Sequence, residues 1–331
     1  MTSSEEYSPF LTWKEKGKFT ADSVSAAFVS LVAMVRDGYQ FNEEKLKQAS
    51  TFFSKIERLN PPRSFFAKLL KTMGKDPAAS IPTLLDSIII LLASPHHSIF
   101  MHSLSFLHKC LDWCSFPNRL TFLSAKLFSR MLSTPFLRDL SAIDNPSILN
   151  DVIWMSVSTI QLSFGTIQSL STICNTDPET IRDMVLHEVL IPIEPSLVQI
   201  SRNPHLLSWN DECNATLIFL TRIFEMSPFH QPTLDFICSS RIPMAFQSLL
   251  SKVEDVDTNQ YIIWKMFENI NKWKEDGTET VSRGRRLLQT LEGEGFSEGL
   301  EQTLLHDEST KYGGLVRYRS FEFMKYLGLN C

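Results

Sequence analysis

The sequence predicts an all-α fold made of many short helices. Glycine is rare, with 12 in 331 residues, and apolar residues recur at helical spacing along the chain. Nine of the 16 prolines directly follow Ser, Thr, Asp or Asn. A short polar residue can cap a helix, and proline suits the first helical position because its missing N–H has no intrahelical partner there. Nine such starts predict a succession of short helices, and segments typical of strands with paired turns are absent.

Taken in order, the apolar residues mark one buried face per predicted helix. In the first half the faces consist of Val24, Phe28, Leu31 and Val35; Leu46, Ala49, Phe53 and Ile56; Phe65, Phe66, Leu69, Leu70 and Met73; Leu84, Leu85, Ile88, Ile89 and Leu92; Phe100, Leu104, Leu107, Leu111 and Cys114; and Leu120, Leu123, Leu127 and Met131. Further helices are predicted at about 146–173, 178–190, 191–201, 210–226, 229–239, 242–253, 258–274, 278–292 and 296–306. The predicted core is Phe28, Leu31, Phe53, Ile88, Ile89, Leu104, Leu107, Leu111, Leu123, Leu127, Ile160, Phe164, Leu217 and Phe267.

One segment without charge, Val152 to Thr176, is long enough to cross a membrane. About half of it is Ser, Thr, Gln or Asn, and its apolar residues occupy one helical face. We therefore expect a buried helix, with a short strand around Leu162 as the alternative. No membrane partner is predicted.

The spacing of the helix breaks favours an array. Ser94-Pro95 and Thr134-Pro135 lie 40 residues apart and enclose two predicted helices, which is the size of an armadillo or HEAT unit. About fifteen short helices cannot share one core, so they should stack in sequence. This predicts an armadillo/HEAT-like superhelical solenoid of short antiparallel helices, with an irregular helical bundle as the alternative.

The predicted organisation has three parts. Residues 1–20 form an N-terminal segment, residues 21–292 form the α-solenoid, and residues 293–331 form an atypical C-terminal cap. The last boundary rests on glycine, because seven of the twelve glycines lie between Gly277 and Gly314. The terminal units of a solenoid are commonly atypical, since they must cover the end of the core.

Composition argues against several classes of protein. No G-x-G-x-x-G and no G-x-x-x-x-G-K-[ST] occurs, so a Rossmann or P-loop nucleotide site is not expected, and no cofactor is predicted. The 32 basic and 37 acidic residues nearly balance, which gives no reason to expect nucleic-acid binding. Residues 1–17 contain no apolar signal-peptide core. We therefore expect a cytoplasmic location, with the nucleus as an alternative, and free thiols at all six cysteines.

Two patterns resemble catalytic or metal sites and are interpreted as neither. Residues 295–299 match G-x-S-x-G, but no strand precedes Ser297 and only His306 follows it, so no catalytic residue is assigned. Six residues of zinc-ligand type lie between positions 96 and 114, but their spacing offers neither an H-x-x-x-H nor a C-x-x-C pair. We interpret these side chains as surface histidines and core thiols, and no metal ligand is assigned.

One charged stripe is the candidate partner-binding site. From Trp113 to Arg138 the chain carries four bases and no acid. Arg119, Lys126 and Arg130 are spaced seven and four apart, so we expect them to share one helix face. Such a stripe can attract an acidic segment of another protein, and the alternative is an ordinary solvated helix face.

Several short motifs resemble a known family. They are Ser8-Pro9-Phe10-Leu11-Thr12-Trp13, Leu111-Asp112-Trp113-Cys114-Ser115, Phe229-His230-Gln231-Pro232-Thr233-Leu234-Asp235-Phe236 and Leu327-Gly328-Leu329-Asn330. Together they resemble a large, lineage-expanded family of uncharacterised proteins in anaerobic flagellate protists. The resemblance implies an armadillo-like helical fold and no known activity, and it supplies no functional residues.

The sequence thus predicts a non-catalytic scaffold or adaptor that binds another protein along an extended α-solenoid surface. The partner and the oligomeric state are not specified. An enzyme with an unrecognised site and a self-association module are the alternatives. An enzyme would need polar groups converging in a pocket, whereas a scaffold needs a long open groove.

Overall fold

The computed structural model describes residues 3–13, 20–58, 62–74, 77–138, 148, 151–152, 155, 171–172, 176–202, 211–250 and 256–293. Helices make up 86% of this part of the chain, and it contains no strand. The predicted all-α class is therefore confirmed. None of the helices in these ranges is both long and apolar enough to span a membrane.

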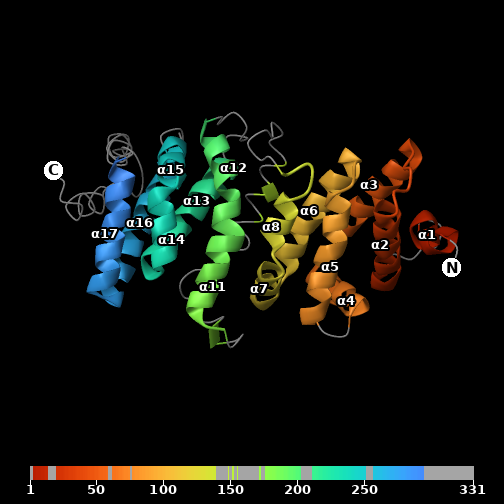
Figure 1. The fold of residues 1–331 in the computed structure, drawn as a ribbon, viewed down its shortest axis with the longest axis horizontal. Helices are drawn as coiled ribbons and strands as arrows, with labels where there is room; N and C mark the ends of the chain where they lie inside the picture. Colours follow the sequence, from red (N-terminus) through yellow and green to blue (C-terminus); the bar gives the residue numbers. More distant parts are fainter. Residues whose placement is uncertain are drawn as a thin grey trace. The chain divides into compact units, whose positions relative to one another are not determined.

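The helices group into two compact units, residues 1–143 and 144–331 (Figure 1). The first unit contains α1 (Ser3–Leu11), α2 (Ala21–Arg36), α3 (Glu43–Glu57), α4 (Pro62–Met73), α5 (Pro77–Leu92), α6 (His97–Trp113), α7 (Phe116–Ser124) and α8 (Leu127–Leu132). The second contains α11 (Pro178–Val185), the π-helical segment η2 (Leu186–Leu190), α12 (Ile191–Arg202), α13 (Asp211–Met226), the 3₁₀ turn η4 (Ser227–Phe229), α14 (Gln231–Ser239), α15 (Ile242–Leu250), α16 (Val256–Asp276) and α17 (Thr278–Gly293). The boundary between the units thus falls inside the range 21–292 that the sequence predicts as one array.

Polar caps fix the start of two helices in the first unit, α2 and α3. Thr20 forms a capping box with Ser23, whose hydroxyl accepts from the Thr20 backbone N–H at 2.9 Å. The Asn42 side chain accepts from the backbone N–H of Lys45 at 2.9 Å and begins α3. Between these helices Gly38 has φ +72°, a left-handed conformation that glycine adopts without steric cost.

The first helix belongs to the first unit. α1 packs against α2, and the Phe10 ring is completely buried. The amide of Gln48 on α3 donates to the backbone carbonyl of Phe10 at 2.8 Å. Residues 3–11, predicted as part of a separate N-terminal segment, are therefore tied to the helices that follow.

Proline marks some of the helix starts correctly. α5 begins at Pro77 and α11 at Pro178, where the Asp177 carboxylate accepts from the backbone N–H of Thr180. Pro9, by contrast, lies inside α1 near its C-terminal end, so the start predicted there is wrong. Pro135 lies in a series of turns in which no helix begins.

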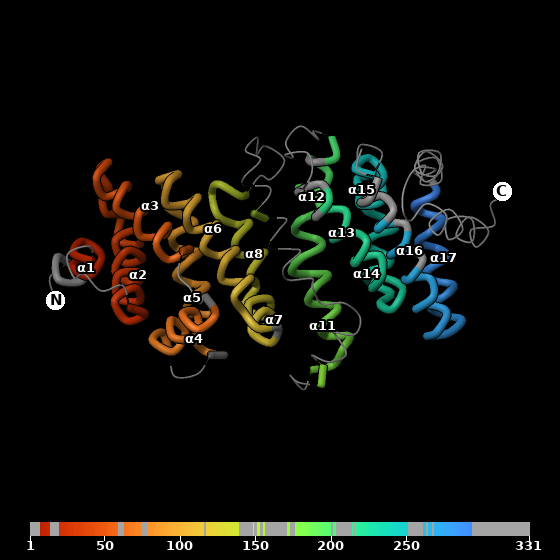
Figure 2. The backbone as a smooth tube through the Cα atoms, turned by 180° about the vertical axis from the view of Figure 1, so that it is seen from behind, coloured from red at the N-terminus to blue at the C-terminus, as the bar shows by residue number. Residues whose placement is uncertain are grey.

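Within each unit, helices contact partners three positions further along. In the first unit α2 packs on α5, α3 on α6 and α5 on α8. In the second, α11 packs on α14, α12 on α15, α13 on α16 and α14 on α17. Figure 1 shows α11, α14 and α17 in a row, and Figure 2 shows α3 beside α6 from the opposite side. Contacts with the third helix along thus recur in both units, beside contacts between helices two apart such as α2 with α4 and α5 with α7.

Hydrogen bonds between these helices join residues 44 to 51 positions apart, as Arg130 with Asp86 and Arg286 with Asp235 mark the two limits. In the first unit, Ser50 bonds to Ser98 and Ser105 donates to Glu57, in each case 48 residues apart. In the second unit, Ser248 donates to the carbonyl of Ser201 across 47 residues. These separations are longer than the 40 residues that proline spacing predicts.

Most of the predicted core is confirmed. Ten of the fourteen residues have exposed fractions of 0%: Phe28, Leu31, Phe53, Ile88, Leu104, Leu107, Leu111, Leu123, Leu127 and Leu217. Ile89 is only half-buried. Ile160, Phe164 and the Phe267 side chain lie outside the described part of the chain.

One long helical run replaces two predicted helices. Pro178 to Arg202 is continuous, because the π-helical segment η2 joins α11 to α12. The backbone N–H of Ile191 donates to the carbonyl of Leu186, five residues earlier. A wider turn of this kind can accommodate Pro192, which has no N–H and whose ring would crowd a carbonyl in a regular helix. The break predicted between residues 190 and 191 is therefore wrong.

Candidate functional site

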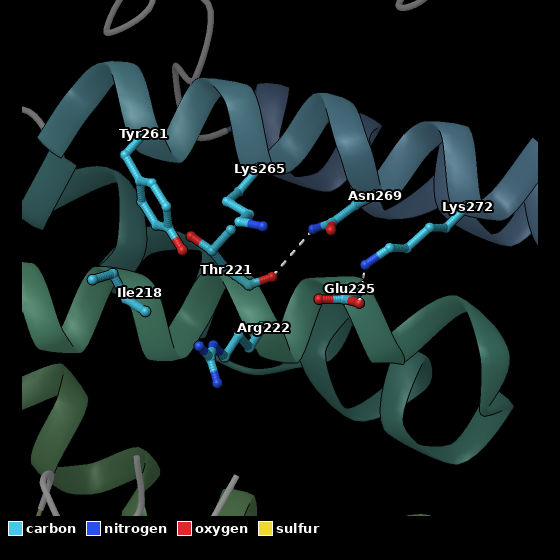
Figure 3. A pocket seen from close by; sticks show the side chains of 8 residues that line it. All are labelled: Ile218, Thr221, Arg222, Glu225, Tyr261, Lys265, Asn269 and Lys272. Carbon is cyan, nitrogen blue, oxygen red and sulfur yellow. Dashed lines mark hydrogen bonds and ion pairs between the residues drawn. The ribbon is translucent and has the colours of Figure 1, made fainter. Parts of the chain in front are cut away.

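A polar groove lies between α13 and α16 in the second unit. Its volume is about 560 Å³, within the range of about 300–1,000 Å³ that is usual for ligand pockets. It is lined by Ile218, Thr221, Arg222, Glu225, Tyr261, Lys265, Asn269 and Lys272 (Figure 3). We refer to this feature as the α13/α16 groove.

Helical spacing explains how two helices present this lining. The α13 residues lie at positions 218, 221, 222 and 225, and the α16 residues at 261, 265, 269 and 272. Separations of three and four residues place side chains on one helix face. Other positions of the same helices, such as Leu217, Phe224 and Met266, are buried in the core. Each helix is thus amphipathic, with its polar stripe facing the groove.

Three hydrogen bonds cross from α16 to α13. The side-chain amide of Asn269 donates to the backbone carbonyl of Thr221 at 3.3 Å. The Lys272 ammonium donates to Glu225 at 2.6 Å, and the Trp273 indole donates to the backbone carbonyl of Glu225 at 3.1 Å. Figure 3 shows the first two of these bonds bridging the helices. The bonds hold the two walls of the groove in register.

Lys265 is positioned by aromatic rings and by a carboxylate. Its ammonium lies 4.3 Å from the centre of the Trp264 ring and 5.8 Å from that of Tyr261. It also donates to Glu268 at 2.7 Å. Cation–π attraction and the ion pair together keep this cation at the groove.

Some polar groups of the groove have no partner within the described part of the chain. The Asn269 side chain is 1% exposed, yet its carbonyl oxygen Oδ1 accepts no hydrogen bond. In the same part of the chain, the Arg222 guanidinium forms no ion pair and the Tyr261 hydroxyl forms no hydrogen bond. A buried acceptor without a partner is unusual and calls for a structural reason.

The predicted stripe of Arg119, Lys126 and Arg130 does not lie on one helix face. α7 ends at Ser124 and α8 begins at Leu127, and Lys126 between them adopts a left-handed conformation with φ 60°. Arg119 is buried, and desolvation lowers its pKa, against the opposing effect of Cys114. Arg130 pairs with Asp86 of α5, an acid that is distant in sequence. The prediction that the three residues share one helix face is therefore wrong, because the helix breaks at Lys126. Their role in partner binding stays a prediction.

The histidines and cysteines of α6 lie in separate surroundings. His102 stacks on Phe53 with ring centres 5.9 Å apart, whereas His108 lies 3.5 Å from Asp112. Cys110 and Cys114 are buried free thiols. Burial raises the pKa of the Cys114 thiol to about 12, so it does not ionise at neutral pH. Cys238 is also free, so the thiol prediction is confirmed for the three cysteines whose side chains are described.

A second polar cluster joins α11 to α14. His230 is 3% exposed, and its Nε2 lies 3.4 Å from Glu179 and 3.3 Å from Asp183. Its Nδ1 hydrogen-bonds to the Thr233 hydroxyl at 2.7 Å. The nearby Arg182 guanidinium donates to Glu179 at 2.7 Å and to the carbonyl of Phe229 at 3.4 Å. These groups partner one another, so the cluster is suited to tying the helices together.

The G-x-S-x-G segment at residues 295–299 lies outside the described part of the chain. No family model, curated protein or solved structure matches this chain. The resemblance to the protist family stays a prediction.

Proposed function

We propose that this chain is a non-catalytic scaffold or adaptor, built as an α-solenoid of armadillo/HEAT type, that binds another protein along an extended surface. The observation that carries the proposal is the α13/α16 groove, which lies between two helices in equivalent positions of the three-helix contact pattern. Stacked helical repeats bind partners on extended surfaces built from neighbouring repeats, and the groove lies between two stacked helices.

The contact pattern supports the solenoid arrangement. In each unit several helices pack on the third helix along, and hydrogen bonds at separations of 44 to 51 residues accompany this packing. A bundle around one core would bring together helices with no fixed separation in sequence. A repeat that contacts mainly its neighbours instead gives separations close to one repeat length.

The chemistry of the groove favours binding over catalysis. Its two lysines form ion pairs with carboxylates, Lys272 with Glu225 at 2.6 Å and Lys265 with Glu268 at 2.7 Å. Cations held by carboxylates and aromatic rings offer a shaped, charged surface to a partner.

The test is affinity capture of partner proteins, followed by binding measurements with purified components. The full chain, carrying an affinity tag, is cross-linked in its native cells, and captured proteins are identified by mass spectrometry. Each candidate is then purified and titrated against the purified chain in an isothermal calorimeter. We expect one candidate to bind with a defined stoichiometry, and sedimentation velocity on the chain alone to show a mass independent of concentration.

Three outcomes would contradict the proposal. One is that no purified candidate binds. A second is a mass that rises with concentration, together with loss of candidate binding, which favours self-association. The third is chemical turnover of a captured small molecule, which favours an enzyme.

A further inference from the structure

We propose that the α13/α16 groove binds an extended peptide segment of the partner that carries an acidic side chain. This inference rests on the proposed function and specifies its ligand. It follows from three groove groups: the guanidinium of Arg222, the hydroxyl of Tyr261 and the side-chain oxygen of Asn269.

The first two groups are suited to a carboxylate. The guanidinium of Arg222 offers a planar fork of donors that matches the two oxygens of a carboxylate. Within the described chain it has no acidic partner, and the Tyr261 hydroxyl on the opposite helix is likewise available as a donor. Figure 3 shows Tyr261 extending from α16 towards α13, with Ile218 beside it. We expect Arg222 to supply the charge, and Tyr261 a hydrogen bond, to an acidic segment in the groove.

Asn269 is suited to the backbone of the same segment. Its amide nitrogen is engaged by the carbonyl of Thr221, which leaves the oxygen Oδ1 as an acceptor for an N–H donor. Asn269 lies between Lys265 and Lys272 on the face of α16 that borders the groove (Figure 3). The Lys265 side chain beside it is 29% exposed and stays paired with Glu268. A peptide N–H would satisfy the unpaired acceptor.

The charge balance favours one carboxylate over a polyanion. Lys272 is paired with Glu225 and Lys265 with Glu268, so Arg222 is the groove cation that lacks an acidic partner in the described chain. A nucleic-acid backbone needs several uncompensated cations, and the two glutamates would repel its phosphates. A peptide with an isolated Asp or Glu meets one cation and also supplies the backbone N–H for Asn269.

The experiment is peptide display on the full chain. A random ten-residue library is selected in parallel on the wild-type chain, on Arg222→Glu and on Arg202→Glu, and all pools are sequenced. Arg202 is exposed on α12, outside the groove lining, and its reversal makes the same change in net charge. We expect enrichment of Asp and Glu at a fixed position on wild type and on Arg202→Glu, and loss of that enrichment on Arg222→Glu.

Affinities of a selected peptide complete the test. Fluorescence anisotropy should show binding weakened about tenfold or more by Arg222→Glu, and several-fold by Tyr261→Phe, which removes only the hydroxyl. Binding by Arg202→Glu should stay within about twofold of wild type, and the effect of Arg222→Glu should shrink as salt rises. Circular dichroism and thermal melting establish that each variant is folded.

The inference is overturned by pools without acidic enrichment, or by equal enrichment on both arginine variants. Displacement of the peptide by an equal concentration of a single-stranded oligonucleotide would also overturn it. Failure of the peptide inference can be told apart from failure of the proposed function. If a purified protein partner binds Arg222→Glu as well as wild type, the groove assignment is wrong and the scaffold proposal stands; if no purified partner binds the wild-type chain, the scaffold proposal is wrong.

Discussion

The indole nitrogen of Trp273 on α16 donates a hydrogen bond to the backbone carbonyl of Glu225 on α13, 3.1 Å away and 48 residues earlier in the chain. The Trp273 side chain is completely buried. Glu225 lies in the last turn of α13, where carbonyls lack a following helical turn as a partner. Trp273 therefore packs in the core and also donates to a backbone carbonyl at the C-terminal end of α13. Both contacts hold α16 against α13 beside the α13/α16 groove.

Gly284 of α17 makes room for that indole, and we predict that Gly284→Ala destabilises the protein. A Cβ atom at position 284 would lie 2.3 Å from Cε3 of Trp273. Alanine inside a helix commonly stabilises by about 1 kcal/mol relative to glycine, but here the clash should reverse the sign and cost about 1–3 kcal/mol. Urea unfolding measures the change, with the exposed Ser282→Ala on the same helix as control. A Gly284→Ala protein as stable as wild type would contradict the prediction.

Lys126 is strained, and we predict that Lys126→Gly stabilises the protein. Its φ of 60° is left-handed, a conformation that costs about 1–2 kcal/mol for a residue with a Cβ. Glycine removes that cost but gains freedom in the unfolded chain, so the expected net gain is up to about 1 kcal/mol. Lys126→Ala is the matched control, because it removes the charge and keeps the strain. Thermal unfolding in which the alanine variant equals or exceeds the glycine variant would refute this explanation.

The same region shows what apolar periodicity can and cannot predict. Leu120, Leu123, Leu127 and Met131 keep helical spacing and are all buried, as predicted. The helix nevertheless breaks at Lys126, where neither glycine nor proline marks a turn. Periodicity predicts which side chains face the core, whereas the continuity of a helix is decided by its packing against other helices.

The sequence alone could not predict the α13/α16 groove either, because the groove also depends on how helices pack against each other. Its residues have the spacing of any exposed helix face, and the pairing of Lys272 with Glu225 links positions 47 residues apart. Such pairing becomes visible only when the helices are placed side by side. One local signal was available: Asn269 is a polar residue between the apolar Met266 and Ile270, both of which are buried.

Leu107 of α6 provides a direct test of the first unit's core. Its side chain has no exposed surface, so Leu107→Ala should cost about 2–5 kcal/mol of unfolding free energy through lost transfer energy and a residual cavity. Val29→Ala on α2 is the control, because Val29 is 52% exposed and surface changes usually stay within about 0.5 kcal/mol. Equal denaturant midpoints for the two variants would show that Leu107 is not in a packed core.

The buried His230 and the half-buried His102 should make stability depend on pH. Desolvation lowers the pKa of His230, against the opposing effect of Glu179 and Asp183, while Arg182 and His187 lower it further. Desolvation also lowers the pKa of His102, against the opposing effect of Glu57. Because both pKa values lie below those of the unfolded chain, the unfolded state binds protons first as the pH falls. The stability that the neutral rings contribute is therefore complete above about pH 6.5 and is lost progressively below it.

The predicted measurement is a fall in unfolding free energy between pH 7.5 and 5.5, and a smaller fall in His230→Gln. Glutamine keeps a polar side chain near Thr233 but does not titrate, so its stability should respond less to pH even if it is lower overall. The exposed carboxylates of Asp37 and Asp235 also have lowered pKa values, but their contribution is lost below about pH 4, outside this window. NMR titration should place the His230 pKa below about 6.5. A wild-type stability that stays constant or rises as the pH falls to 5.5 would show that the rings are not held neutral by burial.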